Sequence, residues 1–330
     1  MRILVMGGTG FVGRAVVSDA VGRGWQVTTY NRGTRSPLDG VEALTGDRLE
    51  TLAPLDGRTW DGVIDTWDGP ASAVSRSVST LRHAVGWYGY VSSRSVYRWP
   101  LPPGADESAP VVDVPPNPDP GDYAADKRGG ELAVLELFGG RALLARAGLI
   151  LGPWENIGRL TWWLERVAAG GGVVAPQPAE RPWQYIDTRD LARFLLDAAA
   201  DGLTGAMNVV SPVGHTTTER LIDACVRATG SDADIVWVPW ETLAAADVGP
   251  WVDLPGCVPP EGENAGLHDC DVRQVLRAGL RCRPVEQTVA DTWAWMRSLD
   301  GPVPLRAGLP TSGLSEEKER KVLSLAGYGY

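Results

Sequence analysis

The sequence is poor in the residues and patterns that build metal sites, disulfide frameworks and membrane spans. Its four cysteines form no C-x-x-C pair and have no zinc-ligand spacing; they are Cys225, Cys257, Cys270 and Cys282. We therefore expect no metal site, and free thiols as in a cytoplasmic protein. No apolar run is long enough to span a bilayer, and the first residues lack a signal-peptide pattern. The sequence thus predicts a cytoplasmic protein without a membrane partner.

Positive charge and phenylalanine are also scarce. The formal net charge is -10, with a pI near 4.9. An acidic surface repels phosphate backbones, so we expect no nucleic-acid partner. The chain has 14 Trp but only 3 Phe, and seven of the Trp fall between residues 154 and 251, in or beside the predicted second lobe. Aromatic walls suit a flat or apolar small molecule, although core packing explains any single Trp equally well.

Short apolar runs alternate with segments of helical periodicity over the first half of the chain. This rhythm predicts an α/β fold with a Rossmann-type, doubly wound parallel sheet and a smaller C-terminal substrate lobe. We assign residues 1–153 with 180–211 to a dinucleotide-binding Rossmann domain, and 154–179 with 212–330 to the lobe. The predicted strands are 2–6, 27–30, 41–44, 60–66, 88–92, 142–150, 184–187, 207–210 and 235–238. The predicted helices are 11–22, 71–84, 122–138, 159–169, 190–200, 217–229, 285–298 and a short one capped by Ser315.

A proline-rich stretch at 98–121 interrupts the rhythm. It is either an ordered loop that shapes substrate access or a flexible insertion.

The turn between the first strand and the first helix carries the spacing G-x-x-G-x-x-G. Gly7 permits the tight turn, Gly10 lets the backbone approach a pyrophosphate, and Gly13 lets helix pack on strand. The helix N-terminus adds free N–H groups and a positive dipole end. We therefore predict that the dinucleotide binds here. The predicted contacts are the three glycines and, between them, Thr9, Phe11 and Val12.

The end of the second predicted strand indicates which dinucleotide is bound. No acid follows Tyr30 to bond a ribose 2′-hydroxyl; Asn31 and Arg32 stand there, and an arginine accommodates a 2′-phosphate. We therefore predict NADP, with NAD as the alternative. Asp47 is a candidate for the adenine amino group or for a helix cap. Arg48 and Thr66 complete the predicted cofactor contacts.

Tyr123 and Lys127 stand four residues apart on one predicted helix. A nearby ammonium lowers a phenol's pKa, so Tyr123 can exchange a proton with a substrate oxygen. Lys127 can also bond the nicotinamide ribose. The third predicted catalytic group is a serine hydroxyl, Ser92 or Ser93, at the end of the fifth strand, at the sheet edge where ligands bind. Ser92 and Ser93 could alternatively just end that strand.

With these motifs in order, residues 1–300 resemble the extended short-chain dehydrogenase/reductase superfamily, the NAD(P)-dependent epimerase/dehydratase group. The resemblance implies the roles of Ser93, Tyr123 and Lys127 given above, a substrate lobe, and in many members a dimer, so we expect a monomer or a homodimer. The motifs that carry it are Gly7–Gly13, Ser92–Tyr97, Tyr123-x-x-x-Lys127, Gly152-Pro153 and Asp187–Ala192.

The departures from this family pattern bear on the reaction. Family dehydratases carry Asp-Glu directly after the active-site Thr, where this chain has Arg94 and Ser95. Water elimination is therefore disfavoured. Sugar-nucleotide enzymes tend to have an Asn after strand six, which 146–150 lacks, so a nucleotide-sugar substrate is in doubt. We expect Arg94, Trp154 and Trp183 nearest the substrate.

Three functions follow. The leading one is an NADPH-dependent carbonyl reductase, or the reverse alcohol dehydrogenase, acting on a small molecule of secondary metabolism. The second is a redox-neutral epimerase of a sugar or sugar nucleotide on retained NAD. The third is a non-catalytic NADP-sensing protein, against which the Tyr123/Lys127 pair counts.

Overall fold

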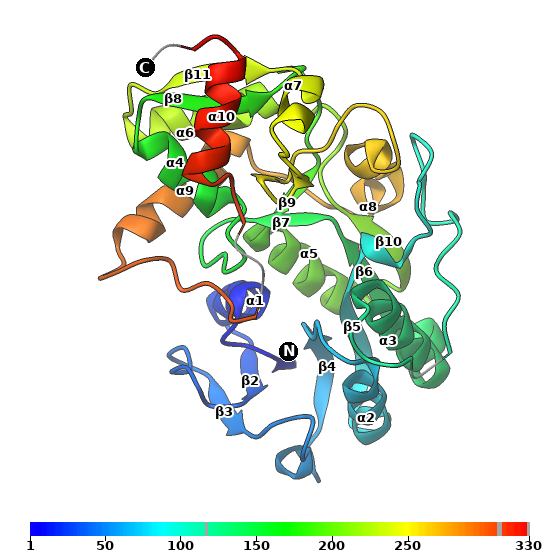
Figure 1. Ribbon diagram of the computed structural model, residues 1–330. Helices are drawn as coiled ribbons and strands as arrows, with labels where there is room; N and C mark the ends of the chain where they lie inside the picture. Colours follow the sequence, from blue (N-terminus) through cyan, green and yellow to red (C-terminus); the bar gives the residue numbers. More distant parts are fainter. Residues whose placement is uncertain (116–117, 309–311, 329–330) are drawn as a thin grey trace.

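The computed structural model describes residues 1–115, 118–308 and 312–328. Figure 1 shows a central sheet with helices on both faces and a second, smaller layer of helices and strands beyond one end of that sheet. The strands of the described residues are β1 (Arg2–Met6), β2 (Gln26–Asn31), β3 (Glu42–Thr45), β4 (Trp60–Asp65), β5 (Val85–Ser93), β6 (Ala142–Ala147), β7 (Leu149–Leu151), β8 (Gly172–Pro176), β9 (Tyr185–Asp187), β10 (Gly205–Val209), β11 (Asp234–Val238), β12 (Pro250–Trp251) and β13 (Leu254–Pro255).

The helices of the same residues are α1 (Phe11–Gly22), α2 (Ala71–Leu81), α3 (Tyr123–Phe138), α4 (Leu160–Ala168), α5 (Thr188–Asp201), α6 (Thr218–Thr229), α7 (Trp240–Ala245), α8 (Arg273–Arg277), α9 (Val285–Arg297) and α10 (Glu316–Leu325). Short 3-10 turns are η1 (Ala53–Leu55), η2 (Arg94–Val96), η3 (Gly139–Arg141) and η4 (Ala265–His268). None of the described helices is long and apolar enough to cross a lipid bilayer.

The central sheet has seven strands in the order β10-β6-β5-β4-β1-β2-β3, and every pairing is parallel. The chain runs outward from β1 in one direction through β2 and β3, and then in the other from β4. The strand order therefore reverses at β1 and β4, whose carboxyl ends form the crevice where ligands of such sheets bind. The predicted Rossmann-type fold is confirmed.

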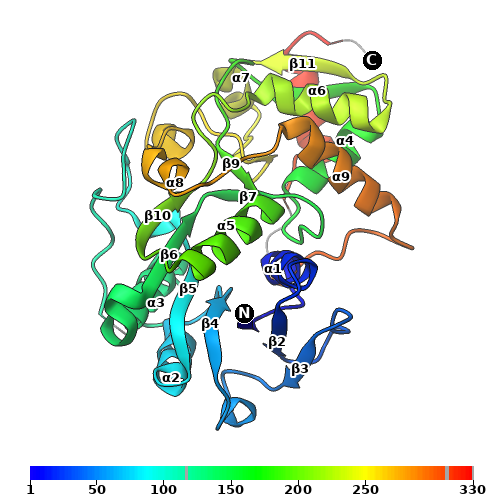
Figure 2. The ribbon, with the colours of Figure 1, turned by 180° about the vertical axis from the view of Figure 1, so that it is seen from behind.

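The strands are buried on both faces because helices cover each side. Successive residues of β1 point to opposite faces: Ile3 and Val5 pack with α1 and α5, whereas Leu4 and Met6 pack with α2 and α3. Figure 2 shows α1 beside α5 from behind the sheet.

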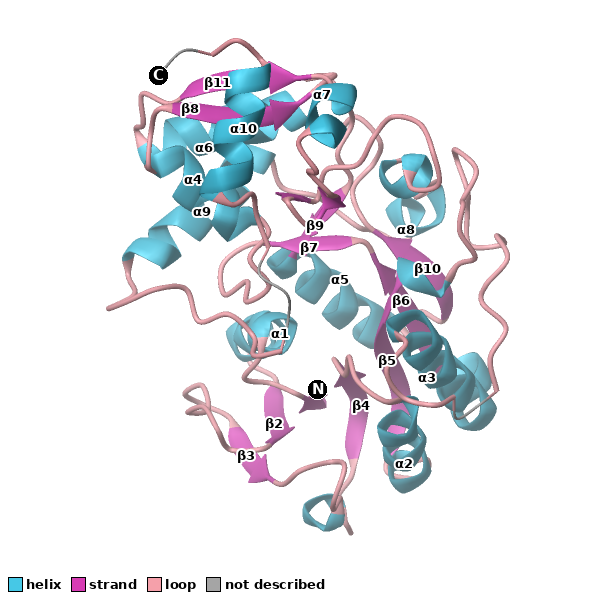
Figure 3. Cartoon of the chain, in the orientation of Figure 1, coloured by secondary structure: helices cyan, strands magenta, loops and turns pink. Residues whose placement is uncertain are grey.

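The second layer is a lobe with its own core. In it β8 and β11 pair in parallel, and α4, α6, α9 and α10 gather around them (Figure 3). Ser315 caps α10 through the amide of Lys318, as the sequence predicts. The strand β8 was not predicted, since its run is only five residues long and begins at a glycine.

Two further differences from the sequence predictions have structural reasons. The predicted strand 142–150 is divided at Gly148, where a Cβ would lie 2.6 Å from Val210, and β7 turns away to pair with β9. Residues 270–280, which the prediction placed in the lobe, pack instead with the core of the sheet through Cys270, Val275 and Leu280.

The described part of the proline-rich loop 98–121 is tied to the sheet edge; residues 116–117 lie outside the described residues. Glu107 accepts a hydrogen bond from the Asn208 amide at 2.8 Å, and its carbonyl accepts one from Arg146. Val112 donates to the Val96 carbonyl at 2.8 Å. These contacts favour the ordered alternative.

Candidate functional site

The glycine turn after β1 is closely packed against its neighbours. Gly7 has φ +96°, a left-handed conformation that favours glycine. A Cβ at Gly13 would lie 2.1 Å from the Gly7 carbonyl oxygen, so only glycine lets α1 approach β1 this closely. No side chain of the described residues caps α1 at Gly10. The first turn of α1 therefore keeps its N–H groups free for an anion.

We expect Gly13→Ala to weaken dinucleotide binding by at least about tenfold, because the added methyl pushes α1 away from the turn. The measurement is an NADPH titration followed by tryptophan fluorescence. Gly22→Ala is the matched control, since it changes the same helix where a Cβ would meet nothing within 4 Å. Equal NADPH affinity in the two variants would contradict this account of the turn.

Arginines gather at the far side of this turn. Arg32 is exposed after β2, and Asn31 accepts a hydrogen bond from the Gly33 amide at 3.0 Å, which shapes the turn that carries Arg32. Arg35, which sequence reasoning missed, donates to the Thr9 carbonyl at 3.3 Å. Burial, and then the charge of Arg35, lower the pKa of Arg14 on the first turn of α1. Positive charge is thus concentrated around the glycine turn.

The other predicted cofactor residues lie around the same edge with different roles. Asp47 Oδ1 accepts from the Leu49 amide at 2.9 Å, so it caps a local turn. Thr66 donates to the Met6 carbonyl at 2.9 Å and packs against Gly7. The buried Arg48 guanidinium makes two 2.7 Å bonds with Asp65 and one with Ser77. Its hydrogen-bonding nitrogens are therefore committed to the protein beneath the site.

Phe11 and Val12 open α1, with Phe11 buried under the turn and Val12 partly accessible.

Tyr123, Lys127 and Ser93 come together at the carboxyl edge of the sheet. Asp122 caps α3 by accepting from the Ala125 amide at 3.0 Å, so the helix begins at Tyr123. Lys127 lies one turn further on and is 2% exposed, whereas Tyr123 is 49% exposed. Lys127 Nζ donates to the Trp67 carbonyl and, at 2.7 Å, to the Val91 carbonyl. These carbonyls follow β4 and belong to β5, so the ammonium joins both strands to α3.

The electrostatics of this group follow from burial. Burial lowers the pKa of Lys127 to about 8, although the carboxylates of Asp68 and Asp65 oppose that shift. Burial also raises the pKa of Tyr123, and a hydrogen bond with Ser93 works in the opposite direction. The ammonium lies 6.0 Å from the centre of the Tyr123 ring. The Tyr123 phenol, which can exchange a proton, and the Lys127 ammonium, whose pKa burial lowers, therefore lie close together.

Ser93 itself ends β5 and starts η2. Its Oγ accepts a hydrogen bond from the Ser95 amide at 3.1 Å, which orients the hydroxyl. The neighbouring Ser92 points into the protein and donates to Glu131 at 2.7 Å. Of the two serines, Ser93 is therefore the one available to a ligand beside Tyr123.

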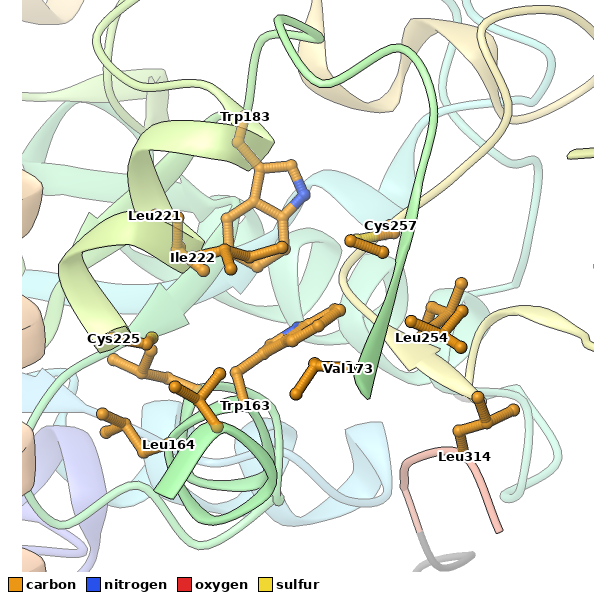
Figure 4. Packing of buried hydrophobic residues seen from close by; sticks show 14 of the residues in the cluster. Trp163, Leu164, Val173, Trp183, Leu221, Ile222, Cys225, Leu254, Cys257 and Leu314 are labelled. Carbon is orange, nitrogen blue, oxygen red and sulfur yellow. The ribbon is translucent and has the colours of Figure 1, made fainter. Parts of the chain in front are cut away.

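The three residues expected nearest the substrate lie in different places. Arg94 is 5% exposed and donates to the Leu267 carbonyl at 2.7 Å, so it joins η2 to η4. Trp154 is exposed, with its ring 3.8 Å from the Arg14 guanidinium. Trp183 is 1% exposed and packs in the lobe core beside Trp163 (Figure 4). Arg94 and Trp183 are thus both buried, Trp183 also lines a small cavity, and their expected contact with a ligand stays a prediction.

Residues that sequence reasoning missed surround Tyr123 from other elements. Asp68 follows β4, Arg159 precedes α4, and Arg306 lies in the segment after α9; all three charges act on the Tyr123 phenol. Arg306 forms an ion pair with Asp68 across 238 positions of sequence. Of these three residues, only Asp68 could have been predicted as a site residue from the sequence, because it closely follows a strand of the sheet.

Within the described residues, no group of three or more His, Cys, Asp or Glu side chains is arranged to hold a metal ion.

Comparison with known proteins supports this description. No family model matches the chain. The chain is 27% identical over 258 residues to the curated Epimerase family protein SDR39U1 of Bos taurus. The aligned region covers 71% of this chain and 83% of that protein.

Solved structures share the fold at low sequence identity. A UDP-Glc/GlcNAc 4-epimerase from Campylobacter jejuni superposes with a TM-score of 0.70 at 12% identity, over 90% of this chain and 99% of that one. WbmH of Bordetella bronchiseptica in complex with NAD+ superposes with a TM-score of 0.67 at 17% identity, over 91% of this chain and 99% of that one. A Thermus thermophilus UDP-glucose 4-epimerase in complex with NAD superposes with a TM-score of 0.64 at 20% identity, over 90% of this chain and 99% of that one. These likenesses show that the chain shares its fold with these proteins.

Proposed function

We propose that this protein is an NADP(H)-dependent oxidoreductase of the extended short-chain dehydrogenase/reductase type. It reduces a carbonyl group of a small-molecule substrate of secondary metabolism, or oxidises the corresponding alcohol. The observation that carries the proposal is the half-exposed Tyr123 phenol above the buried Lys127 ammonium, at the carboxyl edge of a parallel sheet.

Each catalytic side chain has a task that follows from its position. The Ser93 hydroxyl donates a hydrogen bond to the substrate oxygen and stabilises the charge that develops on it. Tyr123 transfers its phenolic proton to that oxygen during reduction and takes it back during oxidation. The positive charge of Lys127 stabilises the phenolate left behind. The nicotinamide, when bound, supplies or accepts the hydride.

The glycine turn and its arginines fit NADP. The free N–H groups at the start of α1 suit the pyrophosphate, and Gly7 and Gly13 leave room for it. Arg32, together with Asn31, stands where the adenosine ribose would lie, and Arg35 adds a second positive charge. Both arginines favour a 2′-phosphate over a free hydroxyl.

We expect Arg32→Ala to weaken NADPH binding by about tenfold to a hundredfold and to leave NADH binding within about twofold, since only NADPH carries the 2′-phosphate. Separate fluorescence titrations of the two cofactors measure this. Arg320→Ala, an exposed arginine on α10, is the control for lost charge. If Arg32→Ala weakened both cofactors equally, the proposed selectivity would be wrong.

A second candidate is a redox-neutral epimerase that oxidises and re-reduces a sugar or sugar-nucleotide substrate on a retained NAD. The curated relative is named as an epimerase family protein, and the solved structures above include two in complex with NAD. The same three side chains would serve it. Dinucleotide released from the purified, denatured protein distinguishes the two: bound NAD favours the epimerase, and an empty site that prefers NADPH favours the reductase.

A further inference from the structure

The Arg159 guanidinium is a positive charge beside the site. Within residues 1–115, 118–308 and 312–328, it has no hydrogen bond or ion pair. It lies over the Trp251 ring, 5.0 Å from the ring centroid. The nearby Glu155 is committed elsewhere, because its two oxygens accept from the backbone amides of Arg159 and Leu160 at 2.5 and 2.9 Å.

Two other arginines near the catalytic group are paired. Arg48 is neutralised by Asp65, and Arg306 by Asp68. Arg159 differs because its partly buried guanidinium has no counter-ion among the described residues, and burial lowers its pKa. A partly desolvated guanidinium without a counter-ion favours an anion that can reach it.

Arg159 also lies beside the proposed reacting group. Its charge and that of Arg306 both act on Tyr123. A backbone contact joins the same segments: the Arg306 amide donates to the carbonyl of Asn156, three residues before Arg159, at 2.8 Å. The Arg306 side chain forms an ion pair with Asp68. The turn before α4, the segment after α9 and the loop after β4 therefore meet around one phenol.

Trp251 forms an apolar wall next to this cation. It is a non-glycine residue with φ +68°, a conformation that costs energy and tends to occur at functional sites. Its amide donates to the Cys257 carbonyl at 2.7 Å, which holds the indole in place. A flat face beside a guanidinium suits a ligand with an apolar ring and an adjacent anion.

We propose that Arg159 binds a carboxylate of the substrate, so that the substrate class is a small aromatic oxo acid or hydroxy acid. This inference rests on the proposed function. One unpaired positive charge matches a monoanion better than a diphosphate, which would leave charge unneutralised. The planar guanidinium can bond both carboxylate oxygens and so fix the direction from which the carbonyl meets Tyr123.

The test compares an anionic probe with its neutral match, benzoylformate with its methyl ester, on the full-length protein with NADPH. We expect Arg159→Gln to lower kcat/KM for benzoylformate by about tenfold to a hundredfold and to leave the methyl ester within about twofold. Arg159→Lys should recover part of the loss, since it keeps the charge without the planar fork. Arg320→Gln is the matched control, because it removes an exposed arginine from α10.

Calorimetric titration of benzoylformate into the NADP+ complex separates this inference from the proposed function. Binding that is at least tenfold weaker in Arg159→Gln than in the wild type supports the carboxylate contact even if neither probe is turned over. The inference is overturned if the wild type does not bind benzoylformate. It is also overturned if Arg159→Gln weakens the anion and the ester equally, as loss of packing on Trp251 alone would do.

Discussion

Replacing Tyr123 with Phe is expected to lower kcat by about a hundredfold to ten-thousandfold while leaving NADPH affinity within about twofold. The substitution removes the one proton-exchanging hydroxyl at the site and keeps the ring. Because Tyr123 is half-exposed as a residue and the substitution keeps its ring, we expect the variant to fold like the wild type. The measurement is NADPH oxidation with a panel of carbonyl compounds, alongside a cofactor titration.

Tyr90→Phe is the matched control for this change. The Tyr90 ring lies 4.9 Å from Lys127 Nζ, but its buried hydroxyl has no partner among the described residues, so its loss should leave kcat nearly unchanged. Undiminished turnover in Tyr123→Phe would overturn the mechanism. Cofactor binding without turnover in the wild type would favour the non-catalytic alternative.

Replacing Lys127 with Met is expected to abolish turnover and yet stabilise the protein by about 1–3 kcal/mol at pH 7. Burial lowers the pKa of Lys127 from 10.5 to about 8, so the native protein carries an ammonium that burial disfavours. Met fills similar space without a charge, although the Trp67 and Val91 carbonyls then lose a donor. Urea unfolding of both proteins measures the difference.

The sign of the pH dependence provides a second check on Lys127. Between pH 8 and 10.5 the unfolded chain keeps the proton on Lys127 and the native protein releases it. The free energy of unfolding of the wild type therefore rises, relative to that of the variant, as the pH rises through that window. The advantage of Lys127→Met should therefore be largest below pH 8 and should shrink towards pH 10. A variant less stable than the wild type at pH 7 would show that the two hydrogen bonds outweigh the burial of the charge.

Local sequence predicted the parts of this site that lie on single elements. Gly7, Gly10 and Gly13 share one turn, and Tyr123 and Lys127 share one helix face, so spacing alone relates them. The doubly wound parallel sheet followed from the alternation of apolar runs and helical segments, and it is confirmed.

The remaining site residues depend on contacts that spacing does not encode. Arg306 reaches Asp68 only because the segment after α9 returns to the sheet edge. Arg94 was expected near the substrate, and spacing did not reveal that its side chain donates to the Leu267 carbonyl of η4. Trp183 was chosen for its aromatic ring, and nothing local to it reveals that the lobe core encloses it.

The bond between Arg94 and the Leu267 carbonyl has a consequence for how this family of sequences can diverge. The acceptor is backbone, which every residue supplies, so position 267 is free to drift among homologues without losing the tie to Arg94. Position 266 is not free, because a Cβ there would lie 2.4 Å from the Leu101 carbonyl oxygen. An alignment should therefore retain an arginine at position 94 and a glycine at position 266, with a variable residue between that glycine and His268.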